Sequence, residues 1–167
     1  MSISSILANM KAFGAAVSGI FMLVLVMQSS VTAQDPQNDT AELQIREAIV
    51  RFQIKTWELA ADSYCISING KDPPEEFLKR FRPLPVKGES GCRKKTIGKV
   101  QMSILDKSTG KHSVIFDLGT IRWLPGGEVE VNGGYLCGSL CMAEGSYHVV
   151  QEPRGWTVTK FEQAVIS

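Results

Sequence analysis

Four cysteines, Cys65, Cys92, Cys137 and Cys141, are the residues whose type and spacing most directly suggest chemistry. They allow two disulfides in three pairings. We predict the pairs Cys65–Cys92 and Cys137–Cys141. The first bond would close a loop whose restriction stabilises the fold by ~3 kcal/mol in the chain-entropy model. The second requires a turn, because an extended strand would hold its two α-carbons about 13 Å apart, beyond disulfide reach.

Free thiols at Cys137 and Cys141 would support other chemistry. Together with Met142 and His148 they form a soft-ligand set that suits copper or zinc. Alternatively the two thiols could exchange disulfides, although redox motifs space their cysteines by two residues at a helix start, whereas three intervene here. Since disulfide formation removes both possibilities, we expect structural cysteines, no bound metal and no cofactor.

Acid–base chemistry would have to come from polar residues within apolar strand segments. Asp117 lies between Phe116 and Leu118, and His148 lies within another strand-like segment. If the strands curl into a cone, Asp117, Tyr135 and His148 could converge inside it. An aspartate and a histidine in an apolar pocket can act as acid and base, which would give a small pocket enzyme of the lyase or isomerase type. The alternative is that strand alternation turns these side chains toward water.

Ligand binding without catalysis is the leading interpretation. We predict that a small ligand or a protein partner binds in or on the sheet, with Trp57, Trp123 and Tyr135 as lining residues. The sequence carries no glycine-rich phosphate loop, nucleophile elbow or paired metal carboxylates that would favour a specific reaction.

The first thirty-three residues have the three-part pattern of a secretory signal peptide. Lys11 precedes an apolar run at residues 13–27, and Val31-Thr32-Ala33 forms a small-x-small cleavage site. The run is shorter than the ~20 residues that cross a bilayer comfortably. We predict cleavage after Ala33 and a secreted or periplasmic mature chain with no stable membrane insertion, where cysteines are oxidised. A retained anchor is the alternative.

Removal of residues 1–33 balances the charge of the chain. Lys11 is the only charged residue removed, so the 18 basic residues fall by one and equal the 17 acidic residues. A neutral chain without a basic surface excess is not expected to bind nucleic acid. We predict a linker at 34–39 and one α+β domain at 40–167, which could form a homodimer through its open sheet face.

The order of elements indicates two helices followed by strands. An amphipathic helix of about twenty residues begins near Asp39, where Glu42 completes a capping box. A short strand at 64–68 precedes a second helix capped by Asp72, and Arg93-Lys94-Lys95 reads as a solvated loop. Later strands are expected at 97–105, 112–123, 128–137, 146–151 and 156–165, with a bulge or bend at Gly133-Gly134. The predicted fold has N-terminal helices packed on a curved antiparallel sheet of four to five strands, because the turns are too short for parallel crossovers.

Two sets of residues resemble known proteins. The closing pattern Ser146-Tyr147-His148-Val149-Val150, a tight turn and Trp156-Thr157-Val158 resembles the nuclear-transport-factor-two-like family. This resemblance implies a cone-shaped α+β fold with a bent sheet around an internal pocket. The combination of residues 64–68, Asp72-Pro73, Ser90-Gly91-Cys92 and 134–141 is similar to a group of uncharacterised exported bacterial proteins. It implies a bacterial envelope or secreted protein and brings no activity with it.

Overall fold

The fold of this chain is α+β, with two disulfides, in a computed structural model that describes residues 36–56, 60–98 and 101–166. The chain divides into the units Met1–Ala33 and Gln34–Ser167, so the predicted leader lies outside the described residues. The elements are α1 (Pro36–Thr56), β1 (Ser63–Ile68), α2 (Glu75–Lys79), β2 (Val86–Gly88), the short 3-10 helix η1 (Glu89–Gly91), β3 (Cys92–Ile97), β4 (Gln101–Asp106), β5 (Ser113–Trp123), β6 (Val129–Gly138), β7 (Cys141–Glu152) and β8 (Gly155–Ile166).

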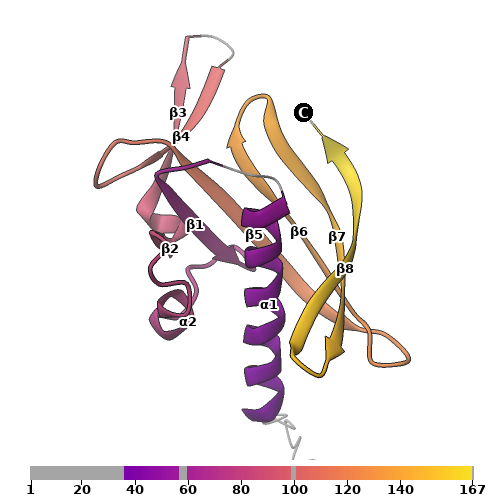
Figure 1. Cartoon of the computed structure of the whole chain (residues 1–167). Coiled ribbons are helices and arrows are strands. Elements are labelled where there is room, and N and C mark those ends of the chain that lie inside the picture. The colour runs from indigo at the N-terminus through magenta and orange to yellow at the C-terminus, as the bar shows by residue number, and fades with distance from the viewer. Residues whose placement is uncertain (1–35, 57–59, 99–100, 167) are drawn as a thin grey trace, which may run out of the picture. The chain divides into compact units, whose positions relative to one another are not determined.

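The sheet contains eight strands, more than the four to five predicted. Strands β5 to β8 form the expected antiparallel meander. One predicted strand at 97–105 is instead the hairpin of β3 and β4, in which Gly98 has a left-handed φ of 67°. The three cationic residues 93–95 therefore belong to strand β3 and not to a loop. This hairpin projects beyond the end of the sheet (Figure 1).

Strand β1 corrects the expectation that parallel pairing is absent. It runs parallel to both β2 and β5. The connection from β1 to β5 passes through α2, β2, β3 and β4, which is long enough for a crossover. From β2 onward, consecutive strands are joined by connections too short for one.

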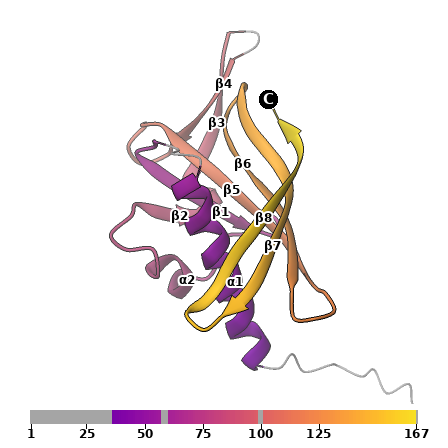
Figure 2. The same ribbon diagram turned by 45° about the vertical axis from the view of Figure 1, so that its right-hand side comes forward.

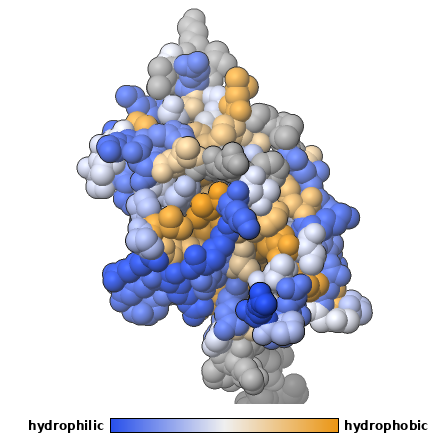
Figure 3. Space-filling view, viewed as in Figure 1, coloured by the Kyte–Doolittle hydropathy of each residue, from blue (hydrophilic) through white to orange (hydrophobic). Residues whose placement is uncertain are grey.

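The long helix α1 packs on one face of the sheet, as the amphipathic pattern predicts. Figures 1 and 2 show it lying across the strands. Ile45, Ile49 and Val50 are fully buried against a core that includes Phe116 and Tyr147. On the side of the molecule seen in Figure 3, hydrophobic residues gather near the middle and hydrophilic residues surround them. No helix within 36–56, 60–98 or 101–166 is long and apolar enough to cross a membrane.

Both helix starts differ from the sequence prediction. Helix α1 begins at Pro36, inside the predicted linker, and a proline suits the first turn because it lacks the amide hydrogen that would be unpaired there. Helix α2 is capped by Pro74, without a side-chain bond. Asp72 does not cap it. Its carboxylate instead accepts hydrogen bonds from the side chain and the backbone N–H of Ser90, which lower the pKa of Asp72.

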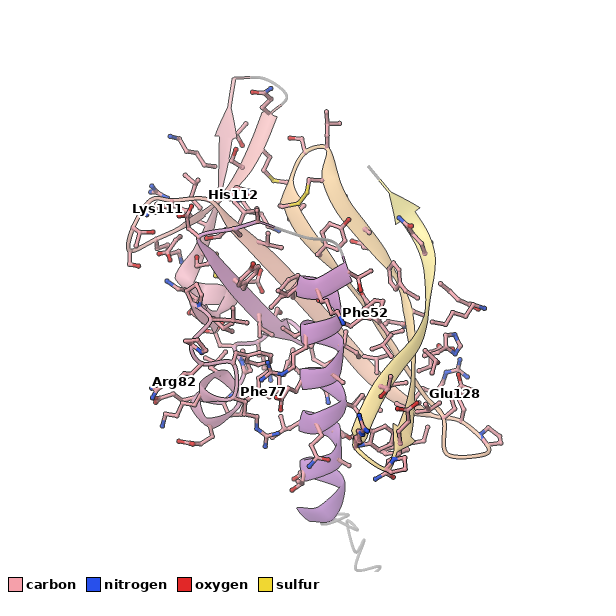
Figure 4. All side chains as sticks on the ribbon, viewed as in Figure 1. Phe52, Phe77, Arg82, Lys111, His112 and Glu128 are labelled. Atoms are coloured by element: carbon pink, nitrogen blue, oxygen red, sulfur yellow. A yellow bond between two sulfur atoms is a disulfide. The ribbon has the colours of Figure 1, made fainter. Side chains whose placement is uncertain are left out.

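The second helix and the turn after it contribute aromatic core residues. Phe77 and Phe81 are fully buried, with their ring centroids 5.2 Å apart. Figure 4 shows Phe77 on the side of α2 that faces α1. Arg51 of α1 lies over the Phe81 ring and donates a hydrogen bond to the Arg80 carbonyl, so the two helices are tied together.

Strand alternation divides the sheet into two faces. Phe116 and Leu118 of β5 point into the core beneath α1, whereas Ile115 and Asp117 point away from it. We call the face away from α1 the outer face. A second, smaller core lies there, formed by Cys65, Cys92, Ile104 and Ile115. The outer face is therefore partly covered, by β3 and β4.

Candidate functional site

A hollow of about 680 Å³ lies on the outer face. Its floor is formed by β1, β5, β6 and β7. Gly70, after the end of β1, Glu89 of η1 and Lys94 of β3 also line it. We call this space the outer hollow. Its size falls within the usual range of small-molecule sites, about 300–1,000 Å³.

One row of the floor is polar and acidic. The strand registers pair Ser67 with Asp117, Asp117 with Gly134, and Gly134 with Glu144. These residues therefore form one cross-strand row, and all four line the outer hollow. Asp117 and Glu144 are separated by the strand that carries Gly134, so their α-carbons lie about 10 Å apart. Gly134 leaves the space between the two carboxylates open.

The adjacent row of the floor is apolar. Ile115 pairs with Leu136, and Leu136 pairs with Met142. Each of these residues lies two positions along its strand from the acidic row, a separation of about 7 Å. All three line the outer hollow. The hollow therefore offers an apolar surface at one end and carboxylates at the other.

The charges of the outer hollow are not neutralised by the protein. Among the described residues, the side chains of Asp117, Glu144 and Glu89 have no hydrogen-bond or ion-pair partner. By contrast, carboxylates elsewhere are paired, as Glu47 is with Arg51 and Glu130 with Arg122. In the part of the chain that the structure describes, Lys94 is the one basic side chain that lines the hollow. The lining therefore carries a net negative charge.

Ser67 gives the outer hollow an unsatisfied polar atom. The residue is only 1% exposed, and its Oγ has no hydrogen-bond partner in the structure. A buried hydroxyl without a partner costs free energy, about 1–3 kcal/mol. Ser67 lines the hollow beside Asp117, so this hydroxyl without a partner lies next to the space that a ligand would occupy.

The glycines of β6 and β7 allow the strands to approach closely below the hollow. A Cβ added to Gly134 would lie 2.0 Å from the carbonyl oxygen of Ala143. One added to Gly145 would lie 2.2 Å from the carbonyl oxygen of Glu162. Such distances are not possible between real atoms, so the local curvature requires glycine at both positions. Beside Gly133, which pairs with Leu118, the pairing shifts between Leu118 and Ile121 of β5, so the irregularity lies next to the glycine pair where a bulge or bend is predicted.

The wall of the hollow is fixed by a buried polar cluster at Asp106. Its carboxylate, in a residue that is 2% exposed, accepts hydrogen bonds from Lys87 Nζ, from Ser63 Oγ at 3.0 Å, and from the backbone N–H and Oγ of Ser108 at 2.7 and 2.6 Å. The bond from Lys87, followed by those from Ser108, holds the pKa of Asp106 far below its usual range. These bonds join β1, β2 and β4.

The predicted acid–base pair is not formed. Asp117 is exposed in the outer hollow, on the face opposite to the expected interior. His148 also lies on the outer face, but its Nδ1 is 2.7 Å from Glu128 Oε1 and its Nε2 is 3.8 Å from Glu162 Oε1. Along β7 it is four positions, about 13 Å, beyond Glu144. The two residues expected to converge are therefore separated.

The predicted aromatic lining is dispersed. Tyr135 lines the outer hollow, and burial raises the pKa of its hydroxyl. Trp123 is 45% exposed and lies outside the hollow, with its ring centroid 5.7 Å from that of Trp156 in an edge-to-face pair. Trp57 lies outside the described residues. Because Tyr135 pairs with Phe116, its side chain packs against the core beneath α1 and only borders the hollow. Tyr135 and Trp123 therefore do not form one lining.

Both predicted disulfides are present. Cys65 pairs with Cys92 across an α-carbon distance of 6.2 Å, and Cys137 pairs with Cys141 across 5.2 Å. No cysteine is free, so the set of Cys137, Cys141, Met142 and His148 lacks the thiolates that copper or zinc would need. Within the described part of the chain, no group of three or more His, Cys, Asp or Glu side chains is placed to hold a metal ion.

No protein-family model, curated sequence or solved structure matches this chain. The candidate site therefore rests on its geometry. Of the residues in the acidic row, the sequence analysis identified Asp117 and missed Ser67, Gly134 and Glu144. Their shared row depends on the register of four strands, and no local pattern carries that information.

Proposed function

We propose that this protein is an exported binding domain that holds a small organic ligand in the outer hollow. The buried Oγ of Ser67, without a partner and beside the open hollow, is the observation that carries the proposal. Small-molecule sites typically combine an apolar lining with a few converging polar groups. The apolar row at Leu136 and the polar row at Asp117 supply both.

Export is part of this proposal. It is supported by the leader pattern that ends at Ala33 and by two disulfides, which persist in oxidising compartments. Relationship to the nuclear-transport-factor-two-like family is also proposed, and a long helix packed on one face of an antiparallel meander supports it. The outer hollow differs from the internal pocket that this resemblance implies, because it lies on the face without the helix.

Catalysis is not part of the proposal. Asp117 and His148 are too far apart to share a proton, and His148 is already held by Glu128. The alternative is that the outer face binds a protein partner. A ligand experiment distinguishes the two, because a flat protein–protein contact would not require the hollow to be open.

Binding can be tested with a panel of small molecules that contains cationic, neutral and anionic members. Backbone amide chemical shifts of the purified protein are recorded with each compound. We expect at least one compound to shift resonances of residues around Asp117, Gly134 and Glu144. Met142→Trp, which fills the hollow, should abolish these shifts. Gln151→Trp, at an exposed position of the same strand outside the hollow, should preserve them. If no compound of any charge class shifts these resonances, the proposed function is wrong.

A further inference from the structure

The outer hollow combines three features that together restrict the chemistry of its ligand. These are the carboxylates without partners, the open space above Gly134 between two of them, and the buried Ser67 Oγ without a partner. We propose that the ligand is a small organic ammonium compound with an apolar body. This inference rests on the proposed function and specifies its ligand.

The charge of the hollow favours a cation. Carboxylates that face one space and outnumber the basic groups there repel each other, and a bound cation relieves this repulsion. Asp117 and Glu144 approach the space above Gly134 from opposite sides, because they lie on the two strands that flank β6. An ammonium group in that space can donate a charge-assisted hydrogen bond to each carboxylate, and such bonds are about twice as strong as neutral ones.

Ser67 offers the ligand a second polar contact. Its hydroxyl lies beside Asp117 in the same row and has no partner within the protein. An ammonium group carries three N–H donors. The two carboxylates can accept two of these hydrogens, whereas Ser67 lies one strand beyond Asp117, away from Gly134, and its Oγ is left for another polar group of the ligand.

The neighbouring row sets the nature of the ligand body. Ile115, Leu136 and Met142 lie about 7 Å from the acidic row, along the same three strands. An alkyl or aryl group attached to the ammonium would cover them and remove apolar surface from water, at about 25 cal/mol per Å². An inorganic cation would leave this surface exposed, and the described residues offer no three-ligand metal cluster.

The test uses three probes of matched length: hexylammonium, 1-hexanol and hexanoate. Titration of the purified full chain by calorimetry gives each affinity, and amide chemical shifts locate each probe. We expect hexylammonium to bind in the outer hollow at least about tenfold more tightly than hexanol, which corresponds to two charge-assisted bonds after their desolvation cost. Hexanoate should not bind there. Added salt should weaken hexylammonium binding, since its attraction is electrostatic.

Variants assign the selectivity to the two carboxylates. Asp117→Asn combined with Glu144→Gln should reduce hexylammonium affinity by about tenfold and leave hexanol affinity unchanged. Glu152→Gln removes an acid on the same strand outside the hollow and should change neither. Circular dichroism and thermal unfolding show whether each variant keeps its fold.

The outcomes distinguish this inference from the proposed function. If hexanol or hexanoate binds in the hollow as tightly as hexylammonium, or if the double variant keeps the selectivity, the ligand is not an ammonium compound and the hollow is still a binding site. If none of the three probes binds, the inference is wrong, and the broader panel decides whether the hollow binds anything. Binding of hexylammonium elsewhere on the surface also overturns it.

Discussion

Asp117 and Glu144 lie on the same face of the sheet, one on each of the two strands that flank Gly134. The gap between their side chains exists because Gly134 has none. The same glycine lets β6 approach β7 so closely that no other residue fits without moving the backbone. One residue therefore controls both the opening of the outer hollow and the local packing of two strands.

Replacement of Gly134 by alanine should damage both properties. The new Cβ would meet the Ala143 carbonyl oxygen, so β6 and β7 must separate. We expect a loss of stability larger than about 2 kcal/mol, the range typical of forced backbone shifts in packed regions, and loss of ligand binding in the hollow. Urea unfolding measures the first and calorimetry the second.

Gly126→Ala is the matched control for this change. Gly126 has a φ of 88° and no atom within 4 Å of an added Cβ, so alanine there meets only backbone strain of about 1–2 kcal/mol. It should leave ligand binding unchanged. Equal effects of the two alanines would show that the close approach of β6 to β7 does not determine stability.

Local sequence patterns predicted the features that depend on neighbouring residues. The spacing of Ile45 and Ile49 gave the buried side of α1, because helical periodicity is a local property. The expectation of an oxidising compartment, together with the short spacing of Cys137 and Cys141, gave both disulfide pairs. Strands β5 and β8 were placed to within a residue or two.

Features that depend on register and on distant contacts were missed. Alternation places Asp117 opposite to Phe116, but the sequence does not say which face α1 covers. The position of Glu144 in the acidic row follows from the tight turn after Gly138, where a longer loop was expected. Asp72 was assigned to a helix cap because the competing partner, Ser90, is distant in sequence. These outcomes depend on tertiary packing, which no window of the sequence contains.

The two disulfides should contribute unequally to stability. Cys65–Cys92 spans 27 residues, and the chain-entropy model gives it ~3 kcal/mol; Cys137–Cys141 spans 4, which gives ~2 kcal/mol. Paired serine variants measured by urea unfolding test this order.

The two disulfides should also differ in how easily they are reduced. Because Cys65 is fully buried while Cys141 is partly exposed, dilute reductant should open Cys137–Cys141 first, and alkylation followed by mass spectrometry detects which bond has opened. Simultaneous opening of both bonds under native conditions would contradict this.

Tyr147 should be the last tyrosine to ionise in the folded protein. Burial raises its pKa to about 12, while a hydrogen bond donated by Gln53 Nε2 at 2.6 Å acts in the opposite direction. Its folded pKa lies above the unfolded value of about 10, so the folded state holds the proton more tightly and stability decreases as the pH rises between these values. Phenolate absorbance should show a step near pH 12 that Tyr147→Phe removes. A wild-type titration complete by about pH 10.5 would argue against burial as the controlling factor.

Asp106 should control the acid stability of the domain. Its carboxylate is held by Lys87, Ser63 and Ser108, and these bonds lower its pKa in the folded state. The folded pKa therefore lies below the unfolded value of about 4, so the contribution of Asp106 is complete above pH 4 and is lost as the pH falls further. We expect the unfolding temperature of the wild type to drop steeply below pH 4. Asp106→Asn should already be less stable at pH 7, with an unfolding temperature lower by more than about 5 °C, because it leaves the Lys87 ammonium without its counter-ion. The further loss of stability of this variant on acidification should be smaller than that of the wild type.

Asp62→Asn serves as the control, since Asp62 is exposed and its contact with Lys111 Nζ is 3.5 Å. This variant should follow the wild-type curve. Parallel acid profiles for wild type and Asp106→Asn would mean that other carboxylates, and not this buried cluster, set the stability of the wall behind the outer hollow.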